Sequence, residues 1–140
     1  MNRMHRPVLS LVIALALMTP AMSGAGTGRT SGSPPIITAL LEPPNGAMVA
    51  ASSRPTFAWE ATPGGRFRVE FSSGKTPFIP TLNSGRRTTP GDQFKPSEKQ
   101  WRTILDLAAV TNTVYWRVLA LGMSEEQIAA APISSFIVTQ

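Results

Sequence analysis

From Ile36 to its end, the chain consists of short apolar runs separated by proline- and glycine-rich segments that are typical of turns. The clearest run covers residues 66–72, "RFRVEFS", in which apolar and charged residues alternate strictly. A period of two places successive side chains on opposite faces of a β-strand. The pattern predicts a strand with an apolar face and a charged face, formed by Phe67, Val69 and Phe71 and by Arg66, Arg68 and Glu70 respectively.

Further segments have the composition of strands, because they are rich in β-branched and aromatic residues and are bounded by turn residues. The longest is residues 113–121, "TVYWRVLAL", whose alternation directs Trp116 inward and both Tyr115 and Arg117 outward. Residues 122–132 are predicted to be a connection. Other strands are expected at residues 36–42, 55–60 and 133–140, with short edge segments at 47–50 and 77–80.

The period of the apolar positions changes once, at residues 97–109. Four apolar residues there follow the spacing i, i+3, i+4, i+7 that marks one face of a helix. Ser97 and Gln100 match the capping box that begins many helices. We therefore expect a short helix, with a strand as the alternative because apolar residues also recur at every second position. The helical face consists of Trp101, Ile104, Leu105 and Ala108.

The first 25 residues differ from the rest of the chain. Arg3 and Arg6 precede an apolar run at residues 8–18, and Pro20 and small residues follow it. This order is typical of a secretory signal peptide. An uncleaved membrane anchor is the alternative, but the apolar run is short for a bilayer span. We predict a signal peptide at 1–25, a flexible linker at 26–34 and one domain at 35–140, with no transmembrane segment after cleavage.

Removal of the signal peptide changes the charge and the available chemistry. Two of the 13 basic residues lie within it, so 11 remain against eight acidic residues. A net charge of +3 is too small to indicate a nucleic-acid-binding surface, and we expect no nucleic-acid partner. The only histidine, His5, is also removed, and the chain contains no cysteine.

Without histidine and cysteine, the common catalytic and metal-binding arrangements are excluded. A serine nucleophile needs a positioned base, and zinc sites need histidine or cysteine ligands. The carboxylates are scattered, and no glycine-rich phosphate loop or calcium loop occurs. We therefore expect no enzyme activity, no metal and no cofactor.

The order of five segments resembles a bacterial fibronectin type III-like module. The segments are "LLEPPNGAMV", "PTFAWEA", "RFRVEF", "VYWRVLAL" and the terminal "SSFIV", and together they extend over nearly all of the predicted domain. The resemblance implies an all-β, seven-stranded fibronectin type III or immunoglobulin-like sandwich. In that family pattern Trp59 is the core tryptophan of the second strand, and Trp116, Val118 and Ala120 face inward.

Two positions depart from the family pattern. The tyrosine that the family places near the start of the penultimate strand falls on Val114 here, and Tyr115 is one residue out of phase. Residues 97–109, where the family has a strand, have a helical pattern. Both departures concern the same corner of the sandwich, while strand number and alternation support a sandwich independently.

With catalysis excluded, binding is the remaining class of function. In the implied sandwich, the strands at 66–72 and 113–121 are neighbours, so their outward residues form one candidate surface. An alternative interpretation is a structural ladder, in which Glu70 pairs with Arg117 and Arg68 covers Tyr115. A second candidate is the loop that holds Lys75 and Ile79, and a third is an exposed sheet edge that accepts a partner strand. The candidate partner-binding residues are Arg66, Arg68, Tyr115, Arg117, Leu119, Phe78, Arg86 and Arg87, to which the last strand would add Ile137.

We expect an exported, non-catalytic module that contacts a protein partner in the cell envelope, in the periplasm or outside the cell. A carbohydrate-binding module, with polysaccharide as its ligand, is the first alternative. It requires several exposed rings, and the predicted inward positions of the tryptophans count against it. An accessory domain of a separately encoded enzyme is the second alternative.

Overall fold

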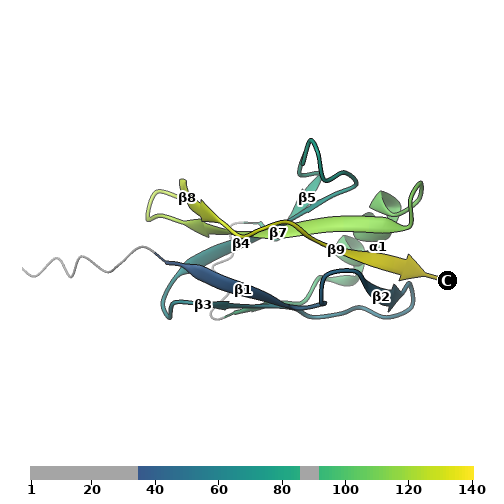
Figure 1. The fold of residues 1–140 in the computed structure, drawn as a ribbon, viewed down its shortest axis with the longest axis horizontal. Helices are drawn as coiled ribbons and strands as arrows, with labels where there is room; N and C mark the ends of the chain where they lie inside the picture. The colour runs from purple at the N-terminus through teal and green to yellow at the C-terminus, as the bar shows by residue number, and fades with distance from the viewer. Residues whose placement is uncertain (1–34, 86–91) are drawn as a thin grey trace, which may run out of the picture. The chain divides into compact units, whose positions relative to one another are not determined.

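Two β-sheets face each other across a hydrophobic core in the computed structural model (Figure 1). The structure describes residues 35–85 and 92–140, which belong to one unit, Ser33–Gln140. The predicted signal peptide, the linker at 26–34, Arg86 and Arg87 lie outside the described residues. Within them, the protein is mostly β with one short helix, as the pattern of apolar positions predicts.

The smaller sheet has three strands in the order β1-β3-β6, and both pairs are antiparallel. Phe57 and Trp59 of β3 point into the core, because residues two apart share a face of the strand. β1 lies at one end of this sheet, so one of its edges has no partner strand among the described residues. The strands are β1 (Ile37–Glu42), β3 (Phe57–Ala61) and β6 (Gln93–Phe94).

The larger sheet has the order β2-β9-β7-β4-β5, and β8 also pairs with β7. Its pairs are antiparallel except for β2 and β9, which are parallel. Phe67, Val69 and Phe71 of β4 are buried, as their alternation predicts. The strands are β2 (Ala47–Ala50), β4 (Arg66–Ser72), β5 (Leu82–Asn83), β7 (Thr113–Leu121), β8 (Gln127–Ala130) and β9 (Ser134–Thr139).

A turn at residues 43–46 carries the chain from one sheet to the other. Gly46 has a φ of 80°, a conformation that glycine adopts without steric cost. Its N–H donates to the carbonyl of Ser135, and the N–H of Ser135 donates to Oδ1 of Asn45. These bonds fix the turn to β9 and start the parallel pairing of β2 with that strand.

The helix expected near residues 97–109 is confirmed as α1 (Glu98–Leu107). Both bonds of the capping box are present: Ser97 Oγ accepts from the N–H of Gln100, and Gln100 Oε1 accepts from the N–H of Ser97. Trp101 and Ile104 are buried, and the Trp101 indole N–H donates to the carbonyl of Ala51 at 2.9 Å. The helix therefore closes one end of the core.

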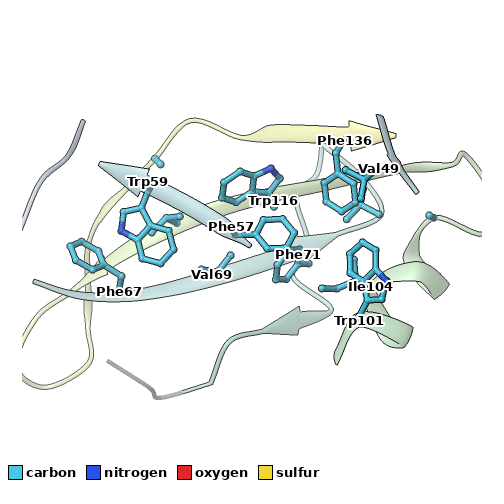
Figure 2. Close-up of a cluster of buried hydrophobic side chains, with 14 of the residues drawn as sticks. Val49, Phe57, Trp59, Phe67, Val69, Phe71, Trp101, Ile104, Trp116 and Phe136 are labelled. Carbon is cyan, nitrogen blue, oxygen red and sulfur yellow. The ribbon is translucent and has the colours of Figure 1, made fainter. Parts of the chain in front are cut away.

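The core is aromatic at its centre (Figure 2). The Phe57 ring of the smaller sheet makes edge contacts with Phe71 and Trp116 of the larger sheet, at centroid distances of 4.9 and 5.0 Å. Trp101 of α1 stacks on Phe136 of β9 at 6.2 Å. The inward orientation expected for Trp59 and Trp116 is confirmed, since neither residue is exposed to solvent.

Two strand predictions are wrong. Residues 77–80 form no strand; the edge strand is β5, two residues further along. Pro77 and Pro80 lack an N–H for ladder bonds, and pairing with β4 starts at Thr81, whose N–H donates to Phe71. Residues 127–130 were expected within a connection but form β8. Alanine has low β-propensity, so the sequence of this segment does not indicate a strand. The strand forms because it pairs with the edge of β7.

In the described part of the chain, no helix is long and apolar enough to cross a membrane.

Candidate functional site

The first candidate surface is the outer face of β4 and β7, which are paired along the whole of β4. Glu70 and Arg117 are direct partners in this register. The Arg117 Nε and Nη2 atoms lie 3.0 and 2.9 Å from Oε2 of Glu70. The ion pair that the ladder interpretation predicts is therefore present, and it neutralises the centre of the face.

The segment between β4 and β5 covers this ion pair. The Phe78 ring lies against the Arg117 guanidinium, whose Cζ is 4.5 Å from the ring centroid. Glu70 is only 7% exposed. Two of the predicted partner-binding residues, Phe78 and Arg117, are thus brought together, but they bind each other. Shielding from water strengthens such a cation–π contact and the ion pair beneath it.

The register corrects two details of the predicted surface. Leu119 is only 3% exposed, so it is not available to a partner. It lies opposite Arg68 on one side and Ala130 of β8 on the other, and the strand that covers its edge was not foreseen. Arg68 does not cover Tyr115, because Ser72 is the partner of Tyr115.

The two arginines in the first half of β4, Arg66 and Arg68, are half-buried. Arg66 donates from Nη1 to the carbonyl of Met123 at 3.1 Å, which ties β4 to the turn after β7. The Nε atom of Arg68 is buried and has no hydrogen-bond partner within residues 35–85 and 92–140. Both side chains are therefore partly shielded from solvent, as long arginine stems commonly are.

The exposed apolar part of the outer face extends from β7 across the neighbouring strands β9 and β2. Met48 is 74% exposed and is the register partner of Ile137, which is 37% exposed. Tyr115 of β7 is half-buried and diagonal to Ile137, since its own partner is Ser135. We call Met48, Ile137 and Tyr115 the outer-face patch.

Sequence reasoning found Tyr115 and Ile137 but missed Met48. The alternation of Met48 with the buried Val49 was the available signal for an outward side chain. The parallel pairing that brings Met48 beside Ile137 joins strands 89 residues apart, and no local pattern encodes it.

In the second candidate, the loop between β4 and β5, some of the predicted residues are exposed and one packs against the first candidate surface. Lys75 and Ile79 are exposed, whereas Phe78 turns back onto Arg117. Arg86 and Arg87 lie outside the described residues. The loop therefore shares Phe78 with the first candidate surface instead of forming a separate cluster.

The tryptophans offer no flat exposed surface. Trp59 and Trp116 are fully buried and Trp101 is 5% exposed, which removes the rings on which a sugar would stack. The described residues contain no group of three or more histidine, cysteine, aspartate or glutamate side chains that could hold a metal ion. The chemistry that this part of the chain presents is that of an apolar patch beside a neutralised ion pair.

Comparison of the chain with protein-family models, curated proteins and solved structures found no match.

Proposed function

We propose that this protein is a non-catalytic β-sandwich module that binds another protein through the outer-face patch. The observation that carries the proposal is the alignment of Met48, Ile137 and Tyr115 on three adjacent strands of one sheet. Contiguous apolar side chains at a surface are a recurring mark of interaction sites. Methionine and tyrosine are also enriched where proteins meet.

The size of the patch defines the kind of contact. Three side chains cover much less than the roughly 800 Å² per partner of a standard stable interface. The patch therefore serves as the apolar centre of a contact whose rim includes polar neighbours such as Thr113 and Ser135. Arg117, two residues from Tyr115 on β7, and Phe78 of the loop between β4 and β5 border the patch and contact each other.

We further infer that the module is fibronectin type III-like and that it is exported. The resemblance of its five segments to that family supports the first point, together with the two facing sheets and the inward Trp59 and Trp116. The charged, apolar and small-residue order of residues 1–25 supports the second. The proposed partner is accordingly a protein of the cell envelope, in the periplasm or outside the cell.

Site-specific photo-cross-linking in the native host tests the proposed function. A photoreactive amino acid at Met48 is expected to capture a discrete partner, whereas the same probe at Met123 captures none. Met123 is the matched control, because it is also an exposed methionine, at 94%, but lies in the turn after β7.

A substitution pair completes that test. Met48→Glu places a charge on the patch and should lower capture from a probe at Ile137 by tenfold or more, whereas Met123→Glu should leave it unchanged. The free energy of unfolding of both variants should lie within about 0.5 kcal/mol of that of the parent protein, because both positions are exposed. Equal capture at the two methionines, or capture insensitive to Met48→Glu, would exclude the patch as the binding surface.

A further inference from the structure

A pocket of about 280 Å³ lies between the two sheets on the side where β1 ends the smaller sheet. Residues 38–40 of β1 form one wall, residues 132–134 form the other, and Asn45 contributes from the turn between β1 and β2. The pocket therefore runs along a strand edge that has no partner among the described residues.

The path of the chain explains why this side is open. β1 and β2 are consecutive but belong to different sheets, and β2 pairs with β9 only between Phe136 and Thr139. The turn at residues 43–46 crosses from one sheet to the other (Figure 1). No described strand lies between β1 and the start of β9, so the core is covered there by the pocket walls alone.

The size and lining of the pocket indicate what it accepts. None of its seven lining residues is charged, and the half-buried Leu40 and Ile133 give it apolar walls. Its volume is below the range of about 300–1,000 Å³ that holds drug-sized ligands, but it is ample for one aliphatic side chain. Oδ1 of Asn45 accepts two bonds from Ser135, while its side-chain N–H groups have no partner among the described residues.

The edge of β1 provides the second recognition element. An unpaired strand edge presents backbone N–H and C=O groups, and the ligand that satisfies them in sequence is another extended backbone. In its pairing with β3, β1 has register shifts on both sides of Ala39 and Leu40, so the regular part of the strand is a short stretch. Such irregularities discourage indiscriminate edge-to-edge association, so the pocket beside this stretch supplies the selectivity.

We propose that β1 accepts an extended, uncharged segment of another protein as a fourth strand of the smaller sheet, with one aliphatic side chain of that segment in the pocket. The proposal rests on the protein-binding function proposed above, but it uses a different surface from the outer-face patch. Backbone pairing along β1 provides affinity, and the uncharged pocket between β1 and residues 132–134 selects the side chain.

Selection from a random twelve-residue peptide library displayed on phage tests this proposal. On the full chain, we expect enriched peptides to share one central leucine, isoleucine or valine within an uncharged stretch. Ala39→Phe fills the pocket from β1 and should lower binding of an enriched peptide at least tenfold. Ala109→Phe, the same change at an exposed position after α1, and Met48→Glu on the outer-face patch should leave that binding unchanged.

Hydrogen exchange of the unaltered chain tests the same strand addition without a substitution, and therefore does not depend on whether Ala39→Phe folds. A bound synthetic peptide should slow exchange of free amides within Ile37–Glu42 at least tenfold. No enrichment, enrichment of peptides with a central charge, or protection elsewhere would overturn the proposal. Protection of β1 that depends on protein concentration without peptide would overturn it in favour of a second copy of the chain. Cross-linking at Met48 reports on the outer-face patch independently of all these results.

Discussion

At the scale of single residues, the environment of Arg117 decides how the outer face is used. Strand alternation places Arg117 and Glu70 on the same side of the sheet, and the register makes them direct partners. The loop from β4 then lays Phe78 against the guanidinium. A residue that the sequence presents as a candidate ligand contact therefore has a structural role, because its charge and its planar face are both occupied.

We expect Arg117→Ala to lower the free energy of unfolding by about 1–3 kcal/mol, because it leaves Glu70 shielded from water without its ionic partner. Urea denaturation of Arg117→Ala, of Glu70→Gln and of the variant that carries both substitutions gives the coupling energy of the ion pair. The matched control is Arg102→Ala, which breaks the exposed pair with Glu98 on α1 and should cost about 0.5 kcal/mol or less. Equal costs for the two arginines would show that the Glu70 pair is no better shielded than the helix pair.

At the scale of elements, α1 and β8 show when local sequence is sufficient. The start of α1 was predictable because its capping box satisfies helix N–H groups within four residues of sequence. β8 was not predictable, because its alanines have no marked strand preference and its pairing depends on the extended edge of β7. α1 was identified because its own residues complete its hydrogen bonds, and β4 and β7 because their apolar positions alternate. β8 carries neither signal.

Substitution of the helix cap measures this local contribution. We expect Ser97→Ala to lower the free energy of unfolding by about 1 kcal/mol, because the N–H of Gln100 loses its acceptor. Ser124→Ala, at an exposed position in the turn after β7, should change it by less than about 0.5 kcal/mol. Thermal unfolding followed by circular dichroism distinguishes them, and a Ser97→Ala cost no larger than the control would argue against a stabilising cap.

At the scale of the whole described unit, buried aromatic side chains pack where the two sheets meet. Phe57 contacts aromatic rings on β4, β6, β7 and β9, so one side chain of the smaller sheet is in contact with much of the core. If this side chain is removed, local rearrangement cannot fill the space it leaves, because its neighbours belong to different strands that are themselves fixed by pairing.

Phe57→Ala should therefore cost about 3–5 kcal/mol of the free energy of unfolding, which is a large share of the roughly 5–15 kcal/mol that stabilises a typical domain. Phe78→Ala, which removes a ring from the surface, should cost much less, about 1 kcal/mol. Equilibrium urea unfolding followed by tryptophan fluorescence measures both variants. A Phe57→Ala cost as small as that of Phe78→Ala would mean that the facing sheets contribute little to stability.

By itself, the sequence determined the all-β class, the inward faces of β4 and β7, the helix with its cap and the absence of histidine and cysteine from residues 35–140. Each of these follows from composition or from a repeat of two or 3.6 residues, which the backbone geometry of a single element imposes. Only the tertiary structure decided which outward residues remain exposed. The burial of Leu119, the contact of Phe78 with Arg117, the pairing of Met48 with Ile137 and the pocket beside β1 all depend on strands or loops far away along the chain. Alternation states which way a side chain points, whereas exposure depends on what the rest of the fold places in front of it.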